Sequence, residues 1–190
     1  MPNRVVIGSQ WGDEGKAKVV DFLTFESDII VRFQGGANAG HTVLVGDQEF
    51  IFHLIPSGIM HADKVCVIGN GVVLDPKQIL IELEEIKEKG IDPKGRFKIA
   101  DNAHVVLPFH KKMDQLKEKK AGKDAIGTTG RGIGPCYSDK VNRLGLRVGE
   151  LLDKEHLATK INSIAEVKNE QFKLLYNAES LDPAQIIEEY

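Results

Sequence analysis

The stretch GSQWGDEGKAK, residues 8–18, decides how the rest of the chain is interpreted. It follows a short apolar run, residues 4–7, which predicts a buried strand. It leads into residues 16–23, whose apolar side chains recur at helical spacing. A strand, a glycine-rich turn and a helix in this order are typical of a phosphate site, because a helix N-terminus offers unpaired N–H groups and a partial positive charge.

Asp13 and Glu14 lie in the middle of this stretch, where an anion would meet their carboxylates. The common P-loop spacing fails here, since Gln10 stands at its first glycine and Ala17 follows Lys16 in place of a hydroxyl residue. A carboxylate beside phosphates is tolerable if Mg²⁺ lies between them, or if it takes a proton from a substrate. The alternative is that both acids only cap the helix.

Composition limits the function classes. The chain has 190 residues, of which 42% are hydrophobic and 28% charged, as in ordinary globular proteins. Its net charge of -3 gives no general attraction to nucleic acid or to a membrane surface. Two cysteines cannot form a disulfide framework, and we see no apolar run long enough for a signal peptide or a membrane span. These features predict a cytoplasmic protein.

Strands alternating with helices predict an α/β fold with a largely parallel central sheet flanked by helices, P-loop-NTPase-like, with a small hairpin and a helical C-terminal part. The expected strands are residues 28–33, 65–68, 97–99 and 104–107, with a hairpin at 42–45 and 49–54. One helix is expected after Asp75-Pro76, with Ile79, Leu80, Leu83 and Ile86 on its buried face and Gly90 as its stop. Further helices are expected at 109–120, at 154–176 with a break, and from Asp182-Pro183.

We expect residues 1–190 to form a single α/β domain. Residues 154–190 are expected to be mainly helical and truncated, because the last helix has no cap before Tyr190.

Two more glycine-rich loops could bind a ligand. FQGGANAGHT ends with Asn38 and His41 near a strand's carboxyl edge, where α/β folds place ligands, although a lone histidine is often structural. GTTGRGIGP offers Thr129, Arg131 and backbone N–H groups for a second phosphate pocket; the alternative is a flexible surface loop. Arg143 belongs to a spaced basic set that is otherwise typical of a solvated face.

The motifs QWGDEGKAK, QGGANAGHT, LIPSG, IGNGVVLDP and IGTTGRGIGP, in this order, closely resemble the adenylosuccinate synthetase family. The resemblance implies a GTP-dependent ligase of purine nucleotide biosynthesis. GTP phosphorylates the 6-oxygen of inosine monophosphate, and the amino group of L-aspartate then displaces that phosphate. It also implies Mg²⁺ and a homodimer in which Arg143 reaches the partner's site.

The resemblance assigns roles to individual residues. Asp13 matches the base that removes the N1 proton of inosine monophosphate, and His41 matches the general acid. The implied metal contacts are Asp13 and the Gly40 carbonyl. The implied GTP contacts are Gly12, Asp13, Glu14, Gly15, Lys16, Ala17, Lys18, Gly40, His41 and Thr42. The implied inosine monophosphate contacts are Asp13, Lys16, Asn38, Ala39, Gly40, His41, Thr129 and Arg143.

Two departures from the family pattern leave other readings open. Ala17 replaces a glycine of the family loop, which lowers phosphate affinity if that position needs a positive φ. Family members also run to more than twice this length, so we expect the N-terminal part of a longer ligase. The alternative is a non-catalytic nucleotide-binding or dimerisation module; a generic P-loop phosphotransferase is weaker still.

Overall fold

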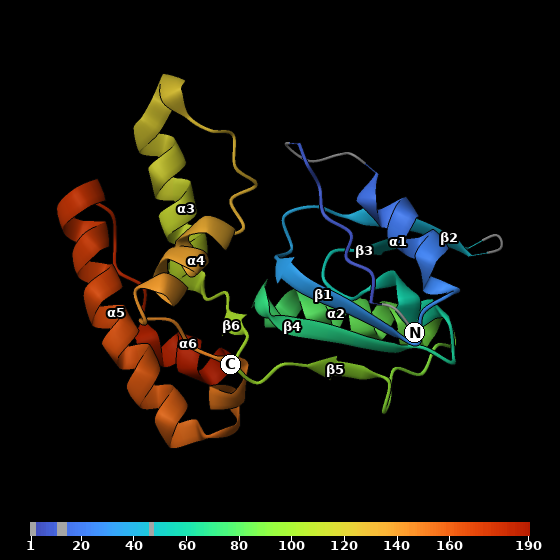
Figure 1. Cartoon of the computed structure of the whole chain (residues 1–190). Coiled ribbons are helices and arrows are strands. Elements are labelled where there is room, and N and C mark those ends of the chain that lie inside the picture. Colours follow the sequence, from blue (N-terminus) through green and yellow to red (C-terminus); the bar gives the residue numbers. More distant parts are fainter. Residues whose placement is uncertain (1–2, 11–14, 46–47) are drawn as a thin grey trace.

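The computed structural model describes residues 3–10, 15–45 and 48–190 (Figure 1). Its main sheet has the order β1-β4-β5, and β6 also pairs with β4; every pairing is parallel. A separate antiparallel hairpin is formed by β2 and β3. These strands confirm the expected parallel sheet and hairpin. Their bounds are β1 (Ile29–Gly35), β2 (His41–Val45), β3 (Gln48–Phe52), β4 (Val65–Leu74), β5 (Phe97–Ile99) and β6 (His104–Val105).

Helices lie beside this sheet and form a second group around the C-terminal part of the chain (Figure 1). Their bounds are α1 (Lys16–Thr24), α2 (Pro76–Glu88), α3 (Pro108–Ala121), α4 (Ile133–Val141), α5 (Lys154–Tyr176) and α6 (Pro183–Glu189). Five of them were expected from the sequence. Helix α5 runs without the expected break, and α4 was not expected at all. Within the described ranges, no helix is long and apolar enough to cross a bilayer.

The prediction of a buried strand at residues 4–7 is wrong. This segment belongs to no strand, and the side chains of Val5 and Ile7 are 74% and 70% exposed. Valine and isoleucine favour strands only where neighbouring strands and helices cover them, and the described part of the chain supplies no such cover here.

Strand β4 is longer than expected, because it continues through Gly69-Asn70-Gly71 to Leu74. The sequence predicts a strand at residues 65–68 alone, but Gly69 and Gly71 let β4 continue close to β1. A Cβ atom on Gly71 would lie 2.0 Å from the carbonyl oxygen of Phe33. The register of the β1–β4 pair also shifts between Arg32 and Gln34, so the two strands meet irregularly near their carboxyl ends.

Helix α2 buries a carboxylate against the sheet. Glu82 is 1% exposed, whereas Leu80, which was expected on this face, is 65% exposed. The Glu82 carboxylate accepts hydrogen bonds at 2.9–3.1 Å from the backbone N–H groups of His53, Leu54 and Ile55. Glu82 therefore holds the chain that leaves the β2–β3 hairpin.

We expect Glu82→Gln to lower the free energy of unfolding by about 2–3 kcal/mol, because the amide keeps one acceptor oxygen and turns an NH₂ group toward buried donors. Glu85→Gln, on the exposed face of the same helix, is the matched control and should change it by less than about 0.5 kcal/mol. Urea denaturation followed by circular dichroism measures both. Equal midpoints for the two variants would show that the Glu82 contacts contribute little.

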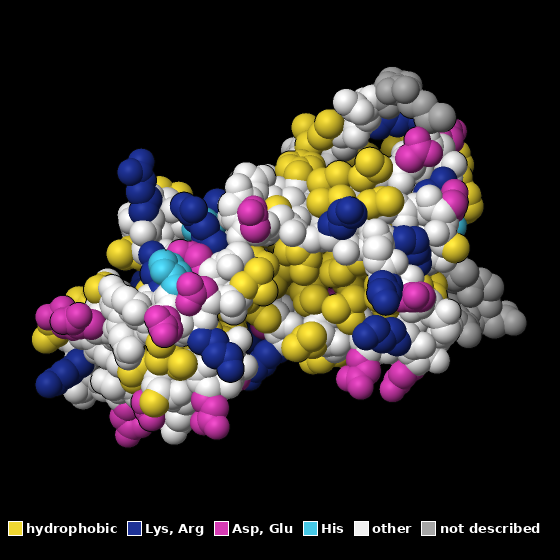
Figure 2. All heavy atoms as spheres, turned by 90° about the horizontal axis from the view of Figure 1, so that it is seen from below, with side chains coloured by type: hydrophobic (Ala, Val, Ile, Leu, Met, Phe, Trp, Pro, Cys, Tyr) yellow, Lys and Arg dark blue, Asp and Glu magenta, His cyan; other side chains and the backbone are white. Residues whose placement is uncertain are grey.

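One face of the main sheet is open. The side chains of Ile29, Val31 and Phe33 of β1 are 59%, 51% and 44% exposed, whereas Ile30 between the first two is buried. Figure 2 shows an apolar surface on the underside of the molecule. Parallel sheets are usually covered on both faces, so this bare face is unusual.

A second apolar core joins α3, α5 and α6, and a buried ionic network links α3, α4 and α5. Asp139 of α4 accepts from His110 Nε2 at 3.0 Å and from Lys168 Nζ at 2.6 Å. Burial alone would raise the pKa of Asp139, but these two hydrogen bonds outweigh it and hold the pKa below its usual value. The network fixes α4 against the two helices beside it.

Candidate functional site

The first part of the candidate site is the start of α1. Gly15 precedes the helix with a φ of 79°, a left-handed conformation that glycine adopts without strain, and its carbonyl accepts from the N–H of Lys18. The backbone of Ala17 is helical, so this position needs no positive φ and alanine suits it. Gly12, Asp13 and Glu14 lie outside the described residues.

The second part is the connection from β1 to β2. Arg32 donates through Nη2 to the carbonyl of Gly36 at 2.7 Å and through Nη1 to the carbonyl of His53. His53 in turn lies 3.2 Å from the carbonyl of Ala39 through Nδ1, which must carry the proton to donate. Burial lowers the pKa of the Arg32 guanidinium, and the Glu82 carboxylate partly offsets this. Two partly buried side chains thus hold both ends of the connection.

This connection leaves its central residues exposed to a ligand. Asn38, Ala39 and Gly40 are exposed, whereas Ala37 just before them is 1% exposed. Thr42 is also exposed and lies in β2. His41 is the first residue of β2, where its backbone pairs with Phe52. Helix α1 also packs against β2.

The third part is the loop at residues 126–132, and it differs from expectation. Several of its backbone N–H groups already donate to carboxylates of α3. Glu118 of α3 accepts from the N–H groups of residues 126–128, and Asp114 accepts from that of Gly132. Arg131 donates to Gln78. Thr129 in this loop is exposed and is one of the residues predicted to contact inosine monophosphate.

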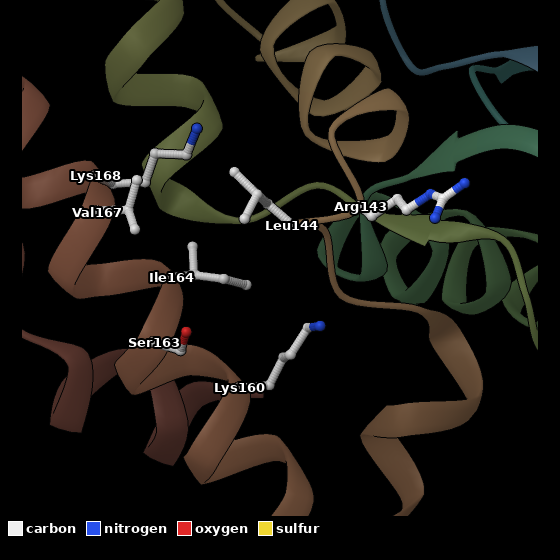
Figure 3. Close-up of a pocket in the computed structure, with 7 residues that line it drawn as sticks. All are labelled: Arg143, Leu144, Lys160, Ser163, Ile164, Val167 and Lys168. Atoms are coloured by element: carbon white, nitrogen blue, oxygen red, sulfur yellow. The ribbon is translucent and has the colours of Figure 1, made fainter.

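Arg143 follows α4 directly and has a φ of 61°, which is uncommon for a residue with a side chain. It borders a cavity of about 240 Å³ beside α5, together with Leu144 and Lys160. Figure 3 shows that Leu144 points toward α5 while the guanidinium of Arg143 extends to the opposite side. Arg143 is therefore presented outward, away from α5.

These parts lie on one side of the molecule. Figure 1 shows the loop before α4 on the same side of the sheet as α1 and the β1–β2 connection. Lys16 is the first residue of α1, Asn38 and Gly40 lie in the β1–β2 connection, and Thr129 lies in the loop before α4. Arg143 is separated from Thr129 by the length of α4.

Metal binding was predicted at Asp13 and the Gly40 carbonyl. In residues 3–10, 15–45 and 48–190, no group of three or more His, Cys, Asp or Glu side chains could hold a metal ion. A carboxylate and a carbonyl oxygen, completed by substrate phosphates, form the kind of donor set that Mg²⁺ accepts. The exposed backbone of Gly40 fits such a role.

Sequence reasoning missed the residues that hold the loops. Arg32 had a visible signal, because a single arginine interrupts the apolar run DIIVRF and must find buried partners. Asp114 and Glu118 had none, since acids four residues apart on a lysine-rich helix look like an ordinary solvated face. Their roles depend on how the loop after the helix folds back on it.

Comparison with known proteins agrees with this geometry. The family model for adenylosuccinate synthetase matches residues 5–190. The adenylosuccinate synthetase of Desulforamulus reducens is 50% identical over 190 residues, covering 100% of this chain and 44% of that protein. That of Nitratidesulfovibrio vulgaris (strain DP4) is 53% identical over 191 residues, covering 100% and 45%. The chain thus spans less than half the length of these curated relatives.

Two solved structures are also similar. One is a fully ligated adenylosuccinate synthetase from Plasmodium falciparum, with a TM-score of 0.82, 38% identity, and coverage of 96% of this chain and 42% of that chain. The other is the succinoaminodeoxyadenylate synthetase of cyanophage S-2L, bound to dGMP and to dATP as an energy donor. Its TM-score is 0.58, at 27% identity over 74% of this chain and 39% of that one. From its sequence and its fold, this chain belongs to the adenylosuccinate synthetase family.

Proposed function

We propose that this chain forms the catalytic N-terminal part of a GTP-dependent ligase that joins inosine monophosphate and L-aspartate. The products are adenylosuccinate, GDP and phosphate. The observation that carries the proposal is the packing of α1, which begins at Lys16, against β2, which begins at His41. This packing supports a site in which the start of α1 binds the triphosphate beside the connection that bears Asn38.

In the proposed mechanism Asp13 removes the N1 proton of inosine monophosphate. The 6-oxygen gains the electron density of the ring anion and attacks the γ-phosphorus of GTP, whose bond to the β-phosphate oxygen breaks. His41 donates a hydrogen bond to the charge that develops on the transferred group. The aspartate amino group then attacks C6, and phosphate leaves with its bonding electrons.

Other groups of the chain position the substrates. Lys16 and the N-terminus of α1 offset the negative charge of the phosphates. Asn38 and Thr129 contact inosine monophosphate from two separate loops. Mg²⁺, held by Asp13 and the Gly40 carbonyl, would shield the carboxylate from the phosphates. We place the reaction in the cytoplasm, in a homodimer in which Arg143 serves the partner's site.

Two other functions compete with this one. The cyanophage synthetase was solved with dGMP, which makes a different purine nucleotide the alternative acceptor. The Plasmodium adenylosuccinate synthetase has the higher identity and TM-score, and this favours inosine monophosphate. A non-catalytic nucleotide-binding or dimerisation module is favoured by the 44% coverage of the Desulforamulus relative.

Isothermal titration of the 190-residue chain separates a part that binds these substrates from a part that accepts another purine or only dimerises. We expect it to bind both inosine monophosphate and GTP, and to bind dGMP more weakly than inosine monophosphate. Asn38→Ala should weaken inosine monophosphate binding about three- to tenfold through one lost hydrogen bond and leave GTP binding unchanged. Asn70→Ala, at an exposed position of β4, is the control. Binding of neither nucleotide would reject the proposal in favour of a structural module.

A further inference from the structure

Tyr137 lies in the middle of α4 and contacts the carboxyl end of β1, near the register shift between β1 and β4. Its hydroxyl accepts a hydrogen bond from the N–H of Gly35 at 2.8 Å. It has one proton to donate, and the carbonyl of Gly71 at 2.8 Å is the nearer acceptor, with the carbonyl of Gly35 at 3.2 Å as the second. One side chain thus joins the last residue of β1 to the middle of β4.

This hydroxyl bonds to the backbone beside an irregularity in the β1–β4 ladder. The register of β1 against β4 shifts between Arg32 and Gln34, just before Gly35. An irregular ladder leaves backbone polar groups without a strand partner, and such groups require one when they are buried. Burial raises the pKa of the Tyr137 hydroxyl, so it keeps the proton that it donates.

A second contact packs α4 against the β1–β2 connection. Gly36 is buried, and a Cβ atom built on it would lie 2.5 Å from Cδ1 of Ile133, the first residue of α4. Only a residue without a side chain lets the helix come this close. Ile133 and Tyr137 are four residues apart, so they project from one face of the helix. That face rests on residues 35–36.

The two contacts lie between the proposed nucleotide-binding residues. Asn38 follows the clamped residues by two positions and is exposed, whereas Thr129 lies in the loop that enters α4. A movement of α4 relative to residues 35–36 would change the distance between Asn38 and Thr129. The buried bonds of Asp139 to His110 and Lys168 already fix α4 from its other side.

We infer that Tyr137 is a positioning residue that fixes the β1–β2 connection relative to α4, and so fixes Asn38 relative to Thr129 in the substrate site. The inference rests on the proposed function for the identity of the ligand. The link that Tyr137 makes between α4 and the β1–β2 connection is a property of this chain alone and does not depend on the proposed function.

The experiment compares Tyr137→Phe with Tyr190→Phe in the 190-residue chain. Tyr190 is a matched control, because its hydroxyl also donates to a backbone carbonyl, that of Val106 at 3.3 Å, in another part of the fold. Hydrogen–deuterium exchange is measured on peptides that cover residues 33–40, inosine monophosphate affinity by isothermal titration, and global stability by urea denaturation.

We expect Tyr137→Phe to speed exchange in residues 33–40 about three- to tenfold, the effect of losing one intramolecular hydrogen bond. The affinity for inosine monophosphate should fall by a similar factor. Tyr190→Phe should change neither, although both variants lower the urea midpoint. Because phenylalanine keeps the ring and its packing, the difference reports on the hydroxyl.

Several results would overturn the inference. Unchanged exchange in Tyr137→Phe, or an equal rise in Tyr190→Phe, would show that Tyr137 does not hold this loop. Faster exchange with unaltered inosine monophosphate affinity would show that the loop is held but that its position does not matter to the ligand. If the parent chain binds no inosine monophosphate, the proposed function fails, and the exchange measurement alone decides whether Tyr137 holds the loop.

Discussion

Asp13→Asn should lower turnover by about 10²–10⁴-fold, the usual contribution of a general base, while nucleotide binding stays largely intact. Asparagine keeps the shape of the side chain but cannot take the N1 proton of inosine monophosphate. The variant is made in this chain joined to the remaining part of the Desulforamulus reducens relative, which supplies the length that this chain lacks. Formation of adenylosuccinate is followed by absorbance.

Asp21→Asn is the matched control, since Asp21 is an acid of α1, the helix that begins after Asp13 in the sequence, and the proposed mechanism gives it no role. It should retain turnover close to that of the parent. If Asp13→Asn also stays within about threefold of the parent, far from the effect of a lost base, Asp13 is only a helix-capping residue. Titration with GTP then distinguishes a lost base from lost binding.

The second large effect is complementation between subunits. Asp13→Asn and Arg143→Leu, each nearly inactive alone in the same joined protein, should together recover about one quarter of parental activity once subunits exchange. Random mixing makes half of the dimers mixed, and two-fold symmetry gives each mixed dimer one intact site and one doubly altered site. Loss of Arg143 matters because a guanidinium binds phosphate through paired hydrogen bonds.

A mixture of Asp13→Asn with the double variant Asp13→Asn/Arg143→Leu is the control, because no dimer in it contains an intact site. Mass labelling confirms that subunits exchange. No recovery in the first mixture, with exchange demonstrated, would place Arg143 in its own subunit's site or on a solvated surface. The outward direction of its side chain (Figure 3) favours recovery.

The sequence predicted those elements whose signals are local. Asp75 caps α2 by accepting from the N–H of Lys77, and Gly90 ends the segment with a φ of 82°, as the pattern indicated. Asp182 caps α6 in the same way. Helix α5 needs no break, because Asp153 caps its start and one stripe of buried apolar side chains continues along it. Caps and periodicity depend on neighbours in the chain, so they can be read without the fold.

Helix α4 escaped prediction because its first turn carries the residues of a loop. Gly132, Gly134 and Pro135 suggest a turn. Pro135 is nevertheless the third residue of the helix, where the first N–H groups have no partner within the helix and a missing donor costs nothing. What stabilises α4 is distant: Asp139 and Tyr137 bond to other elements. No local pattern reports such contacts.

The candidate site was also predicted only in those parts that have a local sequence signal. Glycine-rich motifs identified the loops, and the loop before α4 lies on the same side of the sheet as α1 and the β1–β2 connection (Figure 1). The residues that hold these loops were not identified, because Arg32, Glu118 and Tyr137 bond to backbone groups outside their own strand or helix. The roles of Asp13 and His41 stay predictions.

The bare face of β1 has a consequence for how the chain behaves in solution. Ile29, Val31 and Phe33 form an exposed apolar strip, and the described part of β1 pairs with β4 alone. An uncovered apolar strand at the edge of a sheet is a template for adding further strands, which is the usual start of aggregation. Because hydrophobic attraction weakens on cooling, titrations of the 190-residue chain belong at low temperature and low protein concentration.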